Sequence, residues 1–225
     1  RAIAINPYYA EAHNNLGTAL KAFGQLDEAI KSYMNALTIN PNFADVFFNL
    51  GISYYDLGQT EEALNSYRKA LLINPDFGEV HENLGLILQE TGQTDEAFNS
   101  YVYAVALEPD NANFHRNLST LKKYKEGDTQ LIQMQTLLSS TSISKSERIN
   151  LCFALAKAYE DLGNKDKFFK ILNEGNQLRK EELNYSIEND LKKHNIFKKI
   201  FKLSTRESSS YKSLDVRPIF IVGMP

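Results

Sequence analysis

The chain lacks several features that would place it in other classes of protein. It has a single cysteine, Cys152, so it cannot form an internal disulfide, and the apolar stretch around this residue favours a buried thiol over a nucleophile. No apolar run approaches the roughly 18 to 20 residues that cross a bilayer, and the start of the chain shows no signal-peptide pattern. We therefore expect a cytoplasmic protein without disulfides or membrane spans.

Basic residues are scarce in the first half of the chain. Residues 1–120 contain 6 Lys and Arg against 15 Asp and Glu, whereas residues 121–225 contain 19 against 13, so the two parts carry charges of −9 and +6. An acidic surface repels nucleic-acid phosphates and favours a basic or neutral polypeptide as ligand. We expect neither a nucleic-acid nor a membrane partner.

What the sequence does contain is a repeat with a period of 34 residues. Prolines follow this step without a slip, at Pro7, Pro41, Pro75 and Pro109. Other columns with the same step are Leu16, Leu50, Leu84 and Leu118; Gly17, Gly51 and Gly85; Gly24, Gly58 and Gly92; Ala29, Ala63 and Ala97; Tyr33, Tyr67 and Tyr101; and Ala2, Ala36, Ala70 and Ala104. Together they resemble the tetratricopeptide repeat, a helix pair of 34 residues.

This resemblance implies an all-α fold, a right-handed superhelix (α-solenoid) in which stacked helix pairs share one core. We expect the first helices of the units at about 10–23, 44–57 and 78–91, with the leucine column inside. Small residues would let neighbouring helices approach, and the tyrosine column would fill the space that they leave. Asp27, Thr60 and Thr94, each near a following acidic residue, are expected to favour the start of the second helices by capping and by the helix dipole.

The regular pattern covers only part of the chain, which divides into four segments. Residues 1–120 form the array, with one partial, three complete and one incomplete repeat; residues 121–203 contain degenerate helical repeats and bridging helices. Residues 204–217 are interpreted as a linker, and residues 218–225 as a short terminal strand that begins a missing α/β domain. Because both ends lie inside a pattern, we interpret the chain as a fragment.

A helical stretch over about 177–203 is amphipathic and basic. Its apolar residues Leu191, Ile196, Phe197, Ile200 and Phe201 alternate with Lys192, Lys193, Lys198, Lys199 and Lys202. We interpret it as a helix that docks its apolar face on a neighbouring domain. A membrane surface or an anionic partner is the alternative.

The last nine residues, Arg217 to Pro225, carry a second resemblance. They are similar to the entry of a sulfotransferase domain, and segments 153–161 and 173–179 resemble the bacterial type in which repeats precede such a domain. That family continues with an Arg-Ser-Gly-Thr loop that binds the donor PAPS, and this loop is absent here. The resemblance makes Gly223, Met224 and Pro225 the edge of the PAPS loop. A strand of another nucleotide-binding fold is the alternative.

The candidate binding surface is the inner wall formed by the first helices. Its sixth column is a ladder of asparagines, Asn15, Asn49, Asn83 and Asn117, which resembles the ladder that holds extended substrate in the repeats of O-GlcNAc transferase. Local hydrogen bonding is the alternative role for this column. Neighbouring groove residues are predicted to be Asn14, Phe48, Tyr55, Glu79 and Glu82. Histidines recur in the fourth column without metal-ligand spacing, so we predict packing and no metal site.

These patterns lead to one main functional hypothesis and two alternatives. The chain would be a protein- or peptide-binding scaffold that recruits a polypeptide or other acceptor in its concave groove. A C-terminal sulfotransferase domain in cis, absent here, would then sulfate this acceptor from PAPS. We expect no catalytic residue and no cofactor in this chain, which would be inactive alone. The alternatives are a pure interaction scaffold and the repeat arm of a glycosyltransferase similar to O-GlcNAc transferase.

Overall fold

The computed structural model describes residues 2–184 and 187–207, and every element in these ranges is an α-helix. The helices are α1 (Ala2–Ile5), α2 (Ala10–Ala22), α3 (Leu26–Ile39), α4 (Ala44–Asp56), α5 (Thr60–Ile73), α6 (Gly78–Glu90), α7 (Thr94–Leu107), α8 (Ala112–Leu121), α9 (Thr129–Ser139), α10 (Lys145–Asp161), α11 (Lys165–Glu182) and α12 (Ile187–Glu207). They divide into two compact units, residues 1–178 and 179–225, which are described separately.

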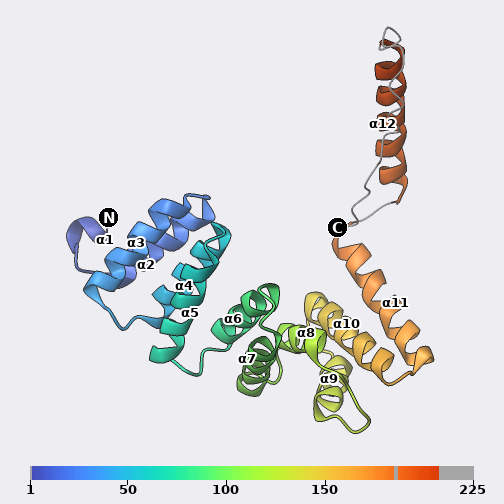
Figure 1. Ribbon diagram of the computed structural model, residues 1–225, viewed down its shortest axis with the longest axis horizontal. Helices are drawn as coiled ribbons and strands as arrows, with labels where there is room; N and C mark the ends of the chain where they lie inside the picture. The colour runs from blue at the N-terminus through green and yellow to red at the C-terminus, as the bar shows by residue number, and fades with distance from the viewer. Residues whose placement is uncertain (1, 185–186, 208–225) are drawn as a thin grey trace. The chain divides into compact units, whose positions relative to one another are not determined.

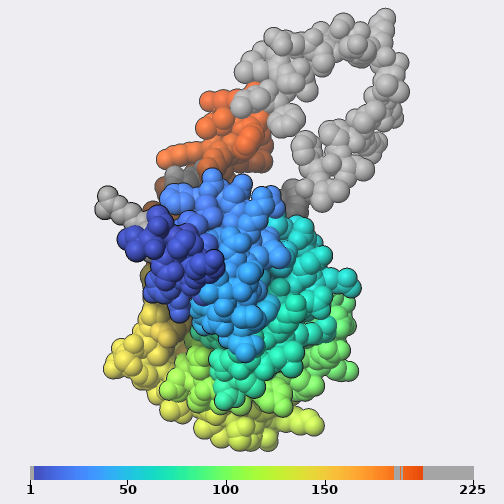
Figure 2. All heavy atoms as spheres, turned by 90° about the vertical axis from the view of Figure 1, so that its left-hand side faces the viewer, coloured from blue at the N-terminus to red at the C-terminus, as the bar shows by residue number. Residues whose placement is uncertain are grey.

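The first unit contains the predicted stack of helix pairs. Helices α2 and α3, α4 and α5, and α6 and α7 each pack tightly as a pair, and the second helix of each pair contacts the first helix of the next. Figure 1 shows these pairs following one another in chain order. In Figure 2 the atoms of successive repeats lie in close contact from the blue to the green helices. The all-α solenoid is therefore confirmed, and its first helices end within one residue of the expected ranges.

Each repeat holds a buried tyrosine against a glycine of its first helix. Tyr67 is buried, and a Cβ atom added to Gly51 would lie 2.3 Å from its Cε1 atom, so the ring occupies the space that only glycine leaves open. The turn between α4 and α5 contains Gly58 with φ of +74°, a left-handed conformation that glycine adopts without strain. The same arrangement recurs in the neighbouring units, because the sequence columns repeat.

The fourth-column histidines form hydrogen bonds to the backbone of the loops between units. In three units the histidine Nε2 atom bonds the carbonyl oxygen of the proline six residues earlier: His13 to Pro7 at 3.0 Å, His81 to Pro75 at 2.9 Å and His115 to Pro109 at 2.7 Å. The sequence predicted packing for this column but not these hydrogen bonds. A carbonyl oxygen that the helices leave unpaired is thereby satisfied.

Two details of the repeats differ from the sequence-based expectation. Leu16 is 43% exposed, whereas Leu50 in the same column is 4% exposed, because in the described residues α2 packs on the four-residue α1 where α4 packs on the full helix α3. The N-cap of α5 is Gln59, without a side-chain cap hydrogen bond, and Thr60 is already the first helical residue. Gln25 and Gln93 likewise precede α3 and α7 without such a bond, so capping by Asp27, Thr60 and Thr94 was a wrong prediction.

Regular pairing ends at α8, as the loss of the sequence pattern predicts. Helix α8 packs far more extensively against α10 than against α9. Helix α9 ends at Ser139 before a polar turn, and α10 begins with a capping box formed by Ser144 and Glu147. A hydrophobic cluster around Met134, Leu151 and Leu155 forms the core here.

In the second unit the helices begin and end at other residues than the sequence predicts. The expected helical stretch 177–203 is divided by a turn at residues 183–184, where Asn184 has φ of +47°, and α12 then continues to Glu207. Residues 204–207 are therefore helical rather than linker. The rest of the predicted linker and the predicted strand 218–225 lie outside the described residues.

Candidate functional site

Hydrogen bonds between consecutive first helices define a polar surface that we call the first-helix face, formed by α2, α4, α6 and α8. Thr120 of α8 donates its hydroxyl to Gln89 Oε1 of α6 at 3.3 Å. Three further bonds are Asn49 Nδ2 to Asn14 Oδ1 at 3.0 Å, Tyr55 hydroxyl to Glu90 at 2.8 Å and Asn117 Nδ2 to Glu82 Oε1 at 2.7 Å. Each of these three bonds joins residues 35 positions apart, which is one repeat of 34 residues plus one, so it connects the first helices of neighbouring repeats. The side chains of this face are therefore held in place before any partner arrives.

The asparagine ladder exists, but most of its amides are used within the protein. Asn49 and Asn117 donate to the fifth-column residue of the preceding repeat. For Asn83 the fifth-column residue of the preceding repeat is Phe48, whose side chain has no acceptor, and Asn83 donates to the carbonyl oxygen of Glu79 at 2.8 Å. Asn15 is exposed. The alternative role of local hydrogen bonding thus describes three members of the ladder.

Apolar groups interrupt the polar surface. Tyr55 and Leu86 are exposed on α4 and α6, so each presents part of its side chain to solvent. Phe48 instead packs against Phe77 and Tyr67, with ring centroids 5.1 and 6.2 Å apart, and belongs largely to the core. Of the predicted aromatic groove residues, Tyr55 is therefore the one available for contact.

The charge of the first-helix face is strongly acidic. Helices α2, α4, α6 and α8 together contain two cations, Lys21 and Arg116, and six carboxylates: Glu11, Asp45, Asp56, Glu79, Glu82 and Glu90. Burial raises the pKa of Glu82 above its ordinary value, and the nearby Glu79 and Glu108 raise it further, against the opposing hydrogen bond from Asn117. A cation brought to this position would be favoured by all three carboxylates.

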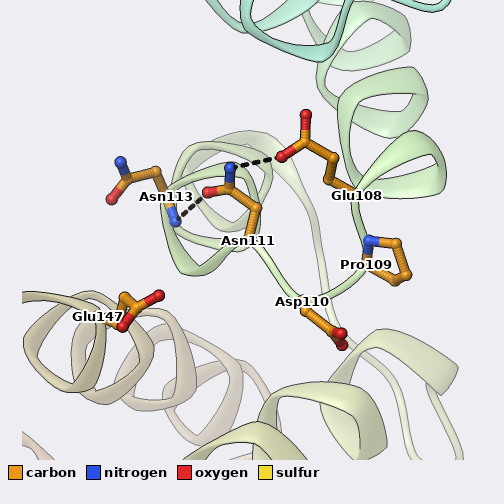
Figure 3. Close-up of a pocket in the computed structure, with 6 residues that line it drawn as sticks. All are labelled: Glu108, Pro109, Asp110, Asn111, Asn113 and Glu147. Carbon is orange, nitrogen blue, oxygen red and sulfur yellow. Dashed lines mark hydrogen bonds between the residues drawn. The ribbon is translucent and has the colours of Figure 1, made fainter. Parts of the chain in front are cut away.

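An open pocket of about 520 Å³ lies where the α7–α8 loop meets α10, as Figure 3 shows. It is lined by Glu108, Pro109, Asp110, Asn111, Asn113 and Glu147. Asn111 accepts from the backbone N–H of Asn113 and donates to Glu108, both at 3.1 Å, which fixes one wall. Its carboxylates continue the acidic character of the array into the fourth repeat.

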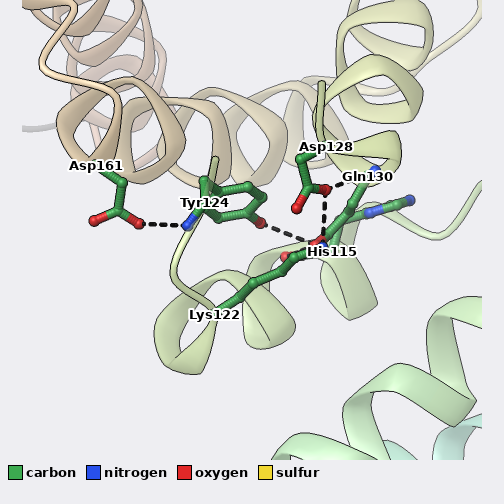
Figure 4. Close-up of polar contacts among 6 residues, drawn as sticks. All are labelled: His115, Lys122, Tyr124, Asp128, Gln130 and Asp161. Atoms are coloured by element: carbon green, nitrogen blue, oxygen red, sulfur yellow. Dashed lines mark hydrogen bonds and ion pairs between the residues drawn. The ribbon is translucent and has the colours of Figure 1, made fainter. Parts of the chain in front are cut away.

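A buried polar cluster joins α8 to α9 and α10, as Figure 4 shows. Tyr124 donates its hydroxyl to Gln130 at 3.1 Å and its backbone N–H to Asp161 at 3.1 Å, and Lys122 pairs with Asp128 at 2.8 Å. Burial raises the pKa of Tyr124 and lowers that of His115, so the first keeps its proton and the second is neutral. Apart from the buried His115 Nδ1 atom, which has no hydrogen-bond partner, these groups satisfy one another and hold the irregular junction together.

Other candidate chemical groups of the first unit have structural roles. Cys152 is completely buried, and burial, with a smaller effect of Glu174, raises the pKa of its thiol to about 12, so it stays protonated. Within residues 2–184 and 187–207 no cluster of His, Cys, Asp or Glu has the arrangement of a metal site. No helix in the same ranges is long and apolar enough to cross a membrane. The predicted PAPS-loop residues Gly223, Met224 and Pro225 lie outside the described part of the chain.

Comparison with known families agrees with this architecture. Profiles described as TPR repeat match residues 19–58 and 53–92, and profiles described as tetratricopeptide repeat match residues 1–31, 78–111 and 149–182. The last match covers α10 and α11, the degenerate pair that follows the irregular junction. The chain therefore contains tetratricopeptide repeats.

Individual relatives add information about the fold. Over 110 residues the chain is 33% identical to a protein of Aquifex aeolicus (strain VF5) whose name is "Uncharacterized protein"; the match covers 47% of the chain and 14% of that relative. Two crystal structures of MamA are similar in fold. One has 22% identity and a TM-score of 0.57 over 79% of this chain and 96% of MamA, and the other has 17% and 0.50 over 74% and 85%.

Proposed function

We propose that the protein is a scaffold whose first-helix face binds a polypeptide segment of basic or neutral character. The observation that carries this proposal is the charge of α4 and α6, which contribute five carboxylates and contain no Lys or Arg. Fixed carboxylates on neighbouring helices attract a cationic segment over several ångströms and favour a partner whose charges have a similar spacing.

The geometry supports weak and adaptable binding. Each polar contact contributes about 1 kcal/mol net, and exposed carboxylates are screened by salt. Tyr55 and Leu86 supply the exposed apolar contact on which a side chain of the partner can pack. An affinity in the micromolar range that falls steeply with ionic strength is the expected signature.

The test is a titration of fluorescently labelled peptides followed by anisotropy. A lysine-containing 12-residue peptide should bind at low salt, and its counterpart with glutamate in place of lysine should not. The double variant Asp45→Asn, Glu79→Gln removes two exposed charges from the first-helix face and should weaken binding by about tenfold. The matched control Glu61→Gln, Glu62→Gln removes two exposed charges from the second helix α5. An equal loss in both double variants would refute the proposed face.

We further propose, from the sequence of residues 217–225, that this scaffold recruits the acceptor of a PAPS-dependent sulfotransferase domain in cis. The support is the resemblance of that nonapeptide and of segments 153–161 and 173–179. The codons that follow Pro225 test it directly. Codons for Arg-Ser-Gly-Thr would support the sulfotransferase, whereas further repeats or a glycosyltransferase domain would favour one of the two alternatives.

A further inference from the structure

The described part of helix α12 is basic and leaves large apolar side chains uncovered. Residues 191–199 are all exposed, and they include Lys192, Lys193, Lys198 and Lys199 but no Asp or Glu. On the same segment Leu191, Ile196 and Phe197 are 54 to 59% exposed. Such apolar exposure on a helix indicates a surface that is covered by a partner.

Helical geometry places lysines beside two of the exposed apolar side chains. At 100° per residue, Ile196 and Phe197 share a face with Lys193, and Lys192 and Lys199 border it. This face is therefore complementary to the first-helix face in charge and in apolar surface. On the first-helix face, carboxylates of α4 and α6 accompany the exposed side chains of Tyr55 and Leu86.

We propose that α12 of one copy of the chain docks on the first-helix face of a second copy. The proposal rests on the function proposed above and names one partner for it. Charge complementarity selects this occupant, because α4 and α6 supply five carboxylates without a cation and residues 191–199 supply four lysines without a carboxylate. An anionic lipid surface would satisfy the lysines but would leave the acidic first-helix face without a partner.

The experiment is sedimentation velocity of the full chain over a range of protein and NaCl concentrations. Self-association should appear at low salt, and its association constant should fall at least tenfold between about 50 and about 300 mM NaCl. At these two concentrations the Debye length is about 14 and about 6 Å, so the charges are weakly screened at the first and strongly screened at the second. A wild-type chain that stays monomeric at all concentrations would overturn the inference, and so would association that ignores salt.

Charge reversal on each side supplies the specificity test. The helix variant is Lys192→Glu, Lys193→Glu, Lys199→Glu, and the face variant is Asp45→Lys, Glu79→Lys. Each alone should lose association by at least tenfold, and an equimolar mixture should form a heterodimer, because the reversed charges are again complementary. Both variants alter exposed residues, and circular dichroism verifies their folding. Unchanged association of either variant, or no recovery on mixing, would contradict the proposed contact.

Two further measurements separate this inference from neighbouring ones. If wild-type chain binds vesicles of phosphatidylserine and phosphatidylcholine and the helix variant does not, while neither chain associates, α12 is a lipid-binding helix and the inference fails. If self-docking occurs, the helix variant should bind the lysine peptide more tightly than wild type, since no α12 competes for the face. Binding of the lysine peptide without self-association would refute the docking of α12 on a second copy and would leave the proposed function intact.

Discussion

The leucine column gives a sharp test of the structure, because two identical residues in it differ in burial. Leu50 is 4% exposed in the core around Tyr33 and Val46, whereas Leu16 is 43% exposed. Replacing leucine by alanine removes three carbon groups, at about 0.8 kcal/mol each when buried, or about 2.4 kcal/mol. A cavity at Leu50 adds to this loss and brings it to about 3 to 5 kcal/mol.

At Leu16 the same change should cost far less. Scaling the transfer term by the buried fraction gives about 1.4 kcal/mol, and solvent can fill the space, so no enclosed cavity adds to it. Urea unfolding of Leu50→Ala and Leu16→Ala, followed by circular dichroism, measures the difference. Because repeats can unfold separately, amide exchange in α4 provides a local readout. Equal losses in the two variants would refute the burial argument.

Three other variants test particular contacts by the same unfolding assay. Gly51→Ala should destabilise the protein by about 1 kcal/mol or more despite the higher helix propensity of alanine, because its Cβ meets the buried ring of Tyr67; a stabilised variant would contradict this packing. Asp161→Ala should cost about 1 to 3 kcal/mol, since it leaves the N–H of Tyr124 unpaired, and faster amide exchange at Tyr124 would accompany the loss. Glu82→Gln should stabilise the protein more at pH 7 than below pH 4. Burial and neighbouring carboxylates raise the pKa of Glu82 in the folded state, so protonated Glu82 favours folding. This contribution to the free energy of unfolding is present below the unfolded pKa of about 4.3 and is lost as pH rises through the folded pKa, and glutamine keeps a neutral side chain at every pH. Identical effects of the substitution at both pH values would show that the pKa is not raised.

The periodic part of the fold could be predicted from the sequence, because each repeated residue has a structural role that depends on its own helix pair. Gly58 ends a helix in a left-handed conformation, and Gly51 makes room for Tyr67, whatever the rest of the chain does. The exposure of Leu16 could not be read from its column, because burial depends on the helix that precedes it in space. The packing of α8 on α10 likewise depends on tertiary contacts that a broken repeat no longer encodes.

The composition of the candidate face could be read from the sequence, its role as a binding surface stays a prediction, and its hydrogen bonds could not be foreseen. An asparagine in the sixth column donates to whatever stands in the fifth column of the preceding repeat. That residue is Asn14 for Asn49, but it is the phenyl ring of Phe48 for Asn83, which therefore turns to its own helix. Such pairing between repeats becomes visible once the stacking register is known, since the partners are 35 positions apart in the chain.

The central claim is that the first helices form the working surface, and mapping by NMR tests it most directly. Backbone amide shifts of isotopically labelled protein would be followed during addition of the lysine peptide at low salt. We predict that the largest changes fall on α2, α4 and α6 and reverse on addition of salt. Changes concentrated on the second helices α3, α5 and α7, with the first helices unaffected, would contradict the account.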